Sequence, residues 1–565
     1  MADTSTVMNT PTKGALTGLP WWKGAVIYQI YPRSFRDTNG DGVGDLSGVL
    51  EGLGHVASLG VDGIWISPFF TSPMADYGYD VADFCGVDPV FGTLDDFDAV
   101  VERAHRLGLK VIIDQVYSHT SDQHVWFEES RLSRDNPKAD WYVWADPKAD
   151  GSPPNNWQSV FGGPSWEWDA RRGQYYMHNF LKQQPDLNVH NLDVQEALIA
   201  AGRFWLERGV DGFRLDALNF SMHDRSLKDN PPSGVSAQEA TRTFDMQVHE
   251  NNMSQPEIAE FIERFSRMLV DYPGTFTVAE VGGPQPIGEM KAFTEGDGRL
   301  DSAYNFDFLY APTLTVEHIK RSTNMWGQAE GEGWPSWAFS NHDAPRAVTR
   351  WSAPQHRDEM ARLYMMLLLS LRGNPILYQG EELGLPQGRV AFDHLKDPEA
   401  VMNWPKTLGR DGARTPFPWD SRAINAGFSG GEPWLPVDPA QAALALDTQQ
   451  GNDSMLRFTR EALQLRKLET SLTVGSMRFL DGFGEYGLGI VREGAGRKIL
   501  ALYNLGDQAL SLPDCATGPG QIILSSRDLK QDGLSDRRLP ARTGVWVLSE
   551  QAEALVMDGP RKTGI

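Results

Sequence analysis

Short apolar runs recur along the chain, and segments with a helical pattern separate several of them. Near-continuous apolar strands that alternate with helices predict a parallel sheet covered by helices. Eight such runs favour closure over an open sheet, so we predict the α/β class and a (β/α)8 TIM barrel. The runs are 26–32 (VIYQIYP), 63–68 (GIWISP), 109–116 (LKVIIDQV), 212–217 (GFRLDA), 275–281 (TFTVAEV), 303–308 (AYNFDF), 337–343 (WAFSNHD) and 375–382 (PILYQGEE).

Two segments carry apolar residues at three-to-four spacing, the pattern of a helix with one buried face. They are 94–108 (LDDFDAVVERAHRLG) and 194–209 (VQEALIAAGRFWLERG), and each ends at a glycine. We expect both in the ring of helices outside the barrel. The longest apolar run, 365–371 (MMLLLSL), is too short to cross a bilayer and predicts a buried helix.

The pattern departs from this repeat in two places. Residues 118–186, after the third strand, are rich in Trp, Pro and Gly and too long for a simple loop, which predicts an inserted subdomain. After about Ser476, short alternating strands (KILALYNLG, TGVWVLSE) predict an antiparallel C-terminal domain, a β-sandwich over 476–565. The barrel then occupies 1–117 and 187–475, with a long loop region after its eighth strand at about 385–460.

The charge of the chain narrows its range of partners. Its 52 basic and 75 acidic residues give a formal net charge of −23, which repels nucleic acid and anionic membranes. We therefore expect a small neutral or cationic ligand, no nucleic acid and no membrane. The oligomeric state is open between monomer and homodimer.

Cysteine usage and the first residues bear on location. Only Cys85 and Cys515 are present, far apart, so we expect no disulfide framework and a reducing compartment. Residues 1–24 contain no apolar run that could form the core of a signal peptide. A cytoplasmic protein is predicted.

Polar residues gather where the predicted strands end, and that end of a TIM barrel carries the chemistry. Alone, a buried Asp or Arg is as typical of an ion pair that supports the barrel as of a catalytic group, and a lone His is more often a satisfied core residue than a reactive one. Together, at corresponding strand ends, they favour a catalytic site. They are His119 after the third strand, Arg214 and Asp216 on the fourth, Glu280 on the fifth, and His342 and Asp343 on the seventh.

Carboxylates dominate this set, and no Cys/His metal cluster, phosphate-binding GxGxxG or GxSxG motif is found. Asp216 and Glu280, on neighbouring strands, could flank one substrate, one attacking and the other exchanging a proton. Retaining glycoside hydrolysis requires that division, at a carboxyl separation of roughly 5–5.5 Å. Arg214, on the same face as Asp216, should keep it ionised. An apolar pocket and a charge such as Asp343 should keep Glu280 protonated.

Sugar rings also need flat aromatic surfaces. Tyr79, Phe161, Phe180 and Trp404 lie in predicted loops and are candidates, although each alone reads as readily as packing.

Ten blocks in this chain resemble the α-amylase superfamily of glycoside hydrolases, in particular its α-glucosidase and oligo-1,6-glucosidase branch, over essentially the whole length. One departure is Ser118, where the family usually has Asn before its histidine. The blocks are WWKGAVIYQIYPRSF, DTNGDGVGD, DYGYDVADF, DQVYSHT, QPDLN, GFRLDALNF, TVAEVGG, FSNHDAPR, QGEELG and GRDGARTPFPW.

The resemblance implies a role for each matched residue. It makes Asp216 the nucleophile, Glu280 the general acid/base and Asp343 the carboxylate that holds the bound sugar. The residues implied to bind the same glucosyl ring are Arg214, His119 and His342, with Tyr79 stacking on it and with Asp76 and Arg414 gripping its non-reducing end. A pocket closed there would release one terminal glucose and exclude the middle of a polymer.

Linkage preference depends on the residue after the nucleophile. In this branch a bulky valine there accompanies α-1,6 preference, whereas this chain has Ala217. We therefore lean towards α-1,4 disaccharides and short maltooligosaccharides. A glycosyl intermediate would also allow transglucosylation, because an alcohol or sugar can compete with water.

The DTNGDGVGD loop resembles the start of an EF-hand, but its twelfth position is Gly48 and no flanking helix pair is evident. An Asx-rich turn without metal is the alternative. The family resemblance implies a structural Ca²⁺ or Mg²⁺ and no organic cofactor. The implied ligands are Asp37, Asn39, Asp41, the Val43 carbonyl and Asp45.

Three other functions compete with an α-glucosidase. An oligo-1,6-glucosidase, or a sucrose isomerase or trehalose synthase, would use the same carboxylates; the arginine-rich aromatic clamp of sucrose isomerases is not apparent around 325–334. A non-catalytic transporter-associated relative would lose the acids and carry a membrane helix, whereas this chain keeps all three acids.

Overall fold

A closed barrel of eight parallel strands forms the centre of the computed structural model, as predicted. The structure describes residues 18–283, 285–328, 332–516, 520–529, 534 and 536–549, so the predicted limits at 1 and 565 lie outside the described residues. The strand order is β1-β13-β12-β11-β10-β9-β5-β2, closing on β1. The strands are β1 Ile27–Ile30, β2 Gly63–Ile66, β5 Lys110–Val116, β9 Gly212–Asp216, β10 Phe276–Val281, β11 Ser302–Asn305, β12 Trp334–Ala338 and β13 Asn374–Tyr378.

The seventh strand is shorter than predicted at its carboxyl end. It was expected at 337–343 but spans Trp334–Ala338, so His342 and Asp343 lie in the loop that follows. The Asn341 side chain accepts the N–H groups of Asp343 (2.9 Å) and Ala344 (2.8 Å) and turns the chain away from the sheet.

Helices cover the outside of the barrel, including the two predicted ones and the one that contains the apolar run 365–371. Helix α2 begins after Thr93, whose side chain and that of Asp96 form a capping box. No helix in the described part of the chain is long and apolar enough to cross a membrane. The main helices of this layer are α1 Leu46–Leu59, α2 Leu94–Arg106, α4 Leu192–Glu207, α5 Ile258–Leu269, α6 Pro286–Thr294, α7 Val316–Asn324, α8 Ala347–Trp351 and α9 Arg357–Ser370.

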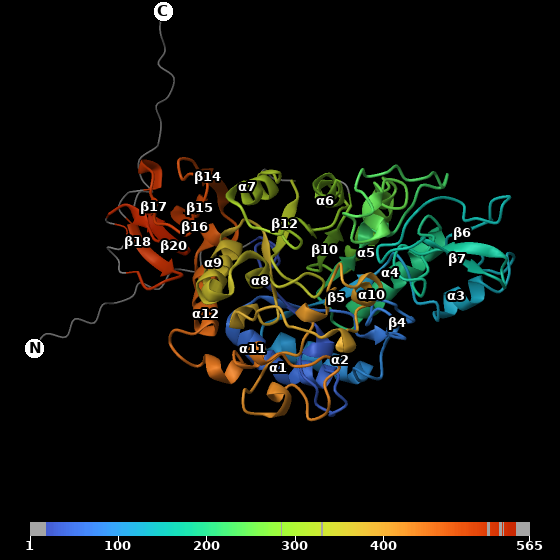
Figure 1. Cartoon of the computed structure of the whole chain (residues 1–565), viewed down its shortest axis with the longest axis horizontal. Helices are drawn as coiled ribbons and strands as arrows, with labels where there is room; N and C mark the ends of the chain where they lie inside the picture. Colours follow the sequence, from blue (N-terminus) through green and yellow to red (C-terminus); the bar gives the residue numbers. More distant parts are fainter. Residues whose placement is uncertain are drawn as a thin grey trace, which may run out of the picture.

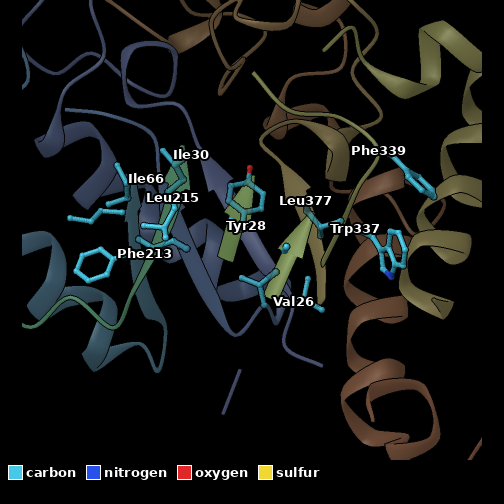
Figure 2. Close-up of a cluster of buried hydrophobic side chains, with 14 of the residues drawn as sticks. Val26, Tyr28, Ile30, Ile66, Phe213, Leu215, Trp337, Phe339 and Leu377 are labelled. Atoms are coloured by element: carbon cyan, nitrogen blue, oxygen red, sulfur yellow. The ribbon is translucent and has the colours of Figure 1, made fainter. Parts of the chain in front are cut away.

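One large core joins the strands to these helices. Figure 2 shows part of it, where Ile30, Ile66 and Leu215 from three barrel strands lie together, each almost fully buried. The register carries polar residues to the same level: Ala279 on β10 pairs with Leu215 on β9, so the next residues, Glu280 and Asp216, are neighbours where their strands end.

The segment inserted after β5 has a small core of its own around Trp157 and Trp166. It contains helix α3 Val125–Ser130 and the antiparallel strands β6 Trp144–Ala145, β7 Trp166–Asp169 and β8 Gln174–Met177. A two-stranded sheet, β3 Phe70–Thr71 with β4 Asp83–Val87, lies in the β2–α2 connection. Figure 1 shows the inserted segment and the C-terminal sheet on opposite sides of the barrel.

The predicted antiparallel C-terminal domain is confirmed. A five-stranded sheet contacts α9 through β16 and β20, and α13 contacts β15. A two-stranded sheet shares an apolar core with it through Leu539. The strands are β14 Ser476–Leu480, β15 Gly487–Gly494, β16 Arg497–Asn504, β18 Gly520–Ser525 and β20 Thr543–Ser549, with β17 Leu510–Ser511 and β19 Arg538–Leu539 in the smaller sheet; helices α10 Pro398–Asn403, α11 Pro439–Ala442, α12 Met455–Leu468 and α13 Thr470–Thr473 precede them.

Candidate active site

The carboxyl ends of the barrel strands border a cavity of about 490 Å³. Arg214, His342 and Arg414 lie fully buried behind its wall. Trp404, an aromatic candidate, is instead 44% exposed and packs on Phe392 outside the lining. The predicted residues that line the cavity are Asp76, Tyr79, His119, Phe161, Phe180, Asp216, Ala217, Glu280 and Asp343.

Arg214 brings the two central acids together. Its Nη1 lies 2.5 Å from Asp216 Oδ1 and 2.6 Å from Asp114 Oδ1, and its Nη2 lies 2.5 Å from Glu280 Oε1. The contact with Glu280 is an ion pair and not a hydrogen bond, since Arg214 Nη2 makes no hydrogen bond of acceptable geometry. Since the two terminal nitrogens of one guanidinium are adjacent, the Asp216 and Glu280 carboxylates face the cavity side by side.

One guanidinium cannot neutralise three buried carboxylates, and this sets their protonation. Burial raises the pKa of Glu280 to about 7, the predicted direction, although Arg214 opposes the shift. Burial also raises the pKa of Asp216 to about 7 against the same opposition, where we expected Arg214 to keep it ionised. The pair therefore retains a proton near neutral pH.

Asp343 is held as an anion by different partners. Its carboxylate lies 2.8 Å from Arg414 Nη2, 3.4 Å from Arg410 Nη1 and 3.1 Å from His342 Nε2. Burial alone raises the pKa of Asp343, but these neighbours together hold it below the usual range. Burial lowers the pKa of His342 to about 3, so its ring is neutral.

The cation beside Asp76 is Arg410, where the resemblance implied Arg414. Arg410 Nη2 lies 2.6 Å from Asp76 Oδ1 and 2.8 Å from Asp397 Oδ1, and Arg410 lines the cavity. Arg414 instead donates to the His342 carbonyl at 2.8 Å. The two arginines flank the 3-10 helix Asp411–Ala413, so both reach Asp343 but only Arg410 contacts Asp76.

His119 and Tyr79 are fixed beside this pair. Tyr79 stacks on His342, with ring centroids 5.3 Å apart and planes 7° apart. His119 Nε2 lies 3.1 Å from the Tyr79 carbonyl, and burial lowers the pKa of His119 to about 4. Ser118, the departure from the family pattern, places its Oγ 2.9 Å from His119 Nδ1 and so orients the ring.

Several lining residues were not predicted. Arg410 stands in a block that the sequence singled out, as does Asp114, which lies buried behind the lining on Arg214, so those blocks were the available signal. Most of the others lie between β9 and α5, where no strand or helix pattern marks them; the length of that connection was the one clue. They include Phe220, Arg242, Phe244, Gln247, Val248, His249 and Met253, together with Phe306, Tyr310 and Glu399 from other segments.

The predicted metal loop is shaped by its own hydrogen bonds. Asp37 accepts three backbone N–H groups of the loop and, at 2.5 Å, the Ser429 hydroxyl. Asp45 accepts the Gly48 N–H at 2.6 Å and so caps α1. In the part of the chain that the structure covers, no group of three or more His, Cys, Asp or Glu side chains is arranged to hold a metal ion. These contacts fit the Asx-turn alternative, and the cation stays a prediction.

Comparison with known proteins agrees with this geometry. The model of the alpha amylase catalytic domain matches residues 29–475. A probable alpha-glucosidase of Rhizobium meliloti (strain 1021) is 50% identical, over 86% of this chain and 90% of that protein. An oligo-1,6-glucosidase of Heyndrickxia coagulans is 35% identical, over 87% and 93%.

Solved structures are similar over nearly the whole chain. An alpha-glucosyl transfer enzyme, XgtA, superimposes with a TM-score of 0.88 at 48% identity, covering 94% of this chain and all of that one. An isomaltulose synthase variant from Erwinia rhapontici NX5 gives a TM-score of 0.85 at 32% identity, covering 95% of this chain and all of that one.

Proposed function

Because the chain belongs to the alpha-amylase family of glycoside hydrolases, we propose that it releases terminal glucose from short α-glucosides with retention of configuration. The observation that carries the proposal is an ion pair between two residues that line the cavity. Asp76 and Arg410, 2.6 Å apart, form an ion pair beside the three carboxylates. A glucosyl unit held there has no room for a further sugar on its non-reducing side.

Two acids divide the reaction. In the first step the Asp216 carboxylate bonds to the anomeric carbon as the glycosidic C–O bond breaks, and Glu280 gives its proton to the leaving oxygen. In the second step water attacks the same carbon, Glu280 takes the proton of that water, and Asp216 leaves. The side-by-side placement of both acids on Arg214 supports this division.

Asp343 and its partners hold the sugar. A carboxylate kept ionised by Arg414 and Arg410 is a strong acceptor for sugar hydroxyl groups. Hydrogen bonds to the ring that strengthen in the transition state contribute several kcal/mol in this class of reaction. The neutral His119 lines the cavity as a further fixed polar group, and the neutral His342 lies behind it against Asp343.

Ala217 supports the α-1,4 preference. Its backbone is left-handed (φ 41°, ψ 40°), its N–H lies 3.2 Å from Glu280 Oε2, and its small side chain lines the cavity beside the acid. A leaving group therefore meets little bulk there. The relatives named oligo-1,6-glucosidase and the neighbour named isomaltulose synthase support the second candidates, α-1,6 hydrolysis and sucrose isomerisation.

Rates on maltose, isomaltose, sucrose and starch test the proposal, with Asp216→Asn as the inactive control. We expect maltose to be cleaved fastest and the α-anomer of glucose to appear first by NMR. Faster cleavage of starch than of maltose would contradict the closed pocket. Glucose released mainly from isomaltose, or a fructose-containing isomer formed from sucrose, would replace α-1,4 hydrolysis with the corresponding second candidate.

A further inference from the structure

A chain of buried polar side chains links the inserted segment to the wall of the active-site cavity. Asp186 Oδ2 accepts the Asn179 side-chain amide at 2.6 Å, and Asn179 Oδ1 accepts the Asn252 amide at 2.7 Å. Asn252 Oδ1 lies 3.1 Å from His249 Nδ1. Exposure is at most 6% at every member of the chain. None of these four residues belongs to the catalytic set described above.

The orientation of each side-chain amide is fixed by backbone groups that can only donate or only accept a hydrogen bond. Asn179 Nδ2 also faces the Asn252 main-chain carbonyl at 3.3 Å, so it is the donor. Asn230 Oδ1 accepts the Asn251 N–H at 3.1 Å, which leaves Asn230 Nδ2 to donate to Asn252 Oδ1 at 2.8 Å. Asn252 Oδ1 is therefore an acceptor, and His249 Nδ1 must carry a hydrogen.

The other ring nitrogen of His249 is held as well. His249 Nε2 lies 2.8 Å from the Phe244 carbonyl, which only accepts, and the His249 and Phe244 rings stack with centroids 3.5 Å apart and planes 10° apart. A protonated ring would satisfy both acceptors, but burial lowers the pKa of His249 and favours the neutral ring, whose Nδ1–H satisfies Asn252. The contacts thus fix the orientation of the ring. Both Phe244 and His249 line the cavity.

The segment that carries this pair runs beside the end of β10, the strand that bears the proton donor. The segment also carries Met253, and a Cβ added to Gly283 would lie 3.0 Å from Met253 Cε. Gly283 follows the proton donor Glu280 by three residues. Since Glu280 must reach the leaving oxygen, the aglycone or an incoming acceptor occupies this side of the cavity, away from the pair that closes the glucosyl end.

We infer that the Phe244–His249 pair is the surface against which an aglycone or acceptor with a flat apolar face packs, and that Asn252 is the positioning residue that holds it. This inference rests on the proposed function, because it concerns the partner in glucosyl transfer. It assigns acceptor preference to the hydrogen-bonded chain Asp186–Asn179–Asn252–His249, here called the relay. The relay is separate from the acids that break the glycosidic bond.

The experiment compares Asn252→Leu with the matched control Asn156→Leu. Asn156 also bonds Asn230, at 2.8 and 2.9 Å, but makes no contact with the relay, so it reports loosening of the loop alone. With p-nitrophenyl α-glucoside as donor and benzyl alcohol as acceptor, p-nitrophenol minus free glucose measures transfer. We expect Asn252→Leu to raise the half-saturating benzyl alcohol concentration about tenfold while kcat changes less than about threefold, the scale of one lost buried hydrogen bond.

His249→Phe, which keeps the stack and loses the hydrogen bond to Asn252, should also raise the half-saturating benzyl alcohol concentration, and it serves if Asn252→Leu folds poorly. Unchanged acceptor saturation in both variants, or an equal change in Asn156→Leu, would overturn the inference. Failure of the proposed function looks different, because wild-type enzyme would then release no p-nitrophenol in the absence of benzyl alcohol.

Discussion

Buried arginines stand at both ends of the barrel, but their partners differ. At the carboxyl ends of the strands, Arg214 and Arg410 meet carboxylates at 2.5 to 3.4 Å. At the opposite end, Arg466 donates to the carbonyls of Leu369 and Leu472 at 2.6 Å and to those of Gly24 and Gly373 at 3.1 Å. Arg492 likewise donates to carbonyls, those of Ser370 at 2.8 Å, Gly475 at 3.0 Å and Ser476 at 3.2 Å.

The difference in partners gives the two sets different tasks. Carbonyls carry no proton, so Arg466 and Arg492 act as static clamps; together they satisfy the last carbonyls of α9 and tie the barrel to α13 and the C-terminal sheet. Burial lowers the pKa of Arg466 to about 10, which still leaves it charged at neutral pH. Carboxylates do exchange protons, and the excess of acids around Arg214 sets where a proton resides.

The largest expected effect is a loss of activity without a loss of stability, at the carboxyl end of the barrel. Asp216→Asn removes the attacking oxygen, so kcat should fall by about 10⁴-fold or more. It also removes one of three acids that share Arg214, so the melting temperature should stay the same or rise. Steady-state rates with p-nitrophenyl α-glucoside and thermal unfolding measure both. A clear loss of melting temperature would mean that the acid serves the fold, as the clamps do.

Arg410→Met should affect both fold and function, because it leaves Asp76 and Asp397 as buried charges without their partner. Breaking such a pair costs about 3–5 kcal/mol of the free energy of unfolding. The closed end of the pocket would also open, so we expect kcat/KM for maltose to fall about 100-fold while the relative rate on longer maltooligosaccharides rises. Denaturant unfolding and rates on a chain-length series test this. An unchanged chain-length profile would remove Arg410 from the pocket.

Arg466→Met should affect the fold alone. Four carbonyls lose their donor, at a cost of about 2–4 kcal/mol in the free energy of unfolding, whereas kcat per folded molecule should remain. Arg460→Met, on the same helix and hydrogen-bonded to Ser58 at 2.8 Å, is the matched control and should cost under about 1 kcal/mol. If kcat of the Arg466 variant fell with its stability in fully folded samples, the separation between the ends would be wrong.

The same contrast shows what sequence could and could not predict. Apolar periodicity located every barrel strand, because strands buried on both faces are written as continuous runs. The acids near the carboxyl ends of those runs, Asp216 and Glu280, followed directly. The choice between Arg410 and Arg414 did not, because the two stand one short helical turn apart and only the position of Asp76 decides between them. The turn at Asn341 was also not predicted, because side-chain hydrogen bonds of Asn341 turn the chain away after that strand, and backbone propensity does not reveal them.

Charge balance was the hardest property to predict. Arg214 and Asp216 were paired correctly, but burial raises the pKa of Asp216 where we expected the acid to stay ionised. Asp114, which arrives from β5 and shares the guanidinium, adds to this rise. The Phe244–His249 wall was missed because its segment has no regular pattern.

The smallest expected effect is the pH dependence of activity and stability that follows from the raised pKa of Glu280. Burial raises the pKa of Glu280 from an ordinary 4.5 to about 7. The acid form donates the proton, so kcat/KM should fall above about pH 7, by at most about tenfold per pH unit. Stability follows the same sign: the contribution of this group is fully present below about pH 4.5 and is lost as pH rises through about 7.

Glu280→Gln isolates the contribution of Glu280 protonation to stability, because a glutamine side chain cannot titrate. Melting temperatures of wild type and variant between pH 5 and 8.5 should converge at low pH, with wild type falling further as pH rises. Wild type and Arg466→Met, measured over the same pH range, give the internal reference. Arg466→Met should lower the melting temperature by a nearly constant amount, because the neighbours of Arg466 are carbonyls and burial leaves its pKa near 10. Parallel wild-type and Glu280→Gln curves would show that the proton does not reside on Glu280, and would move it to Asp216, the other acid on Arg214.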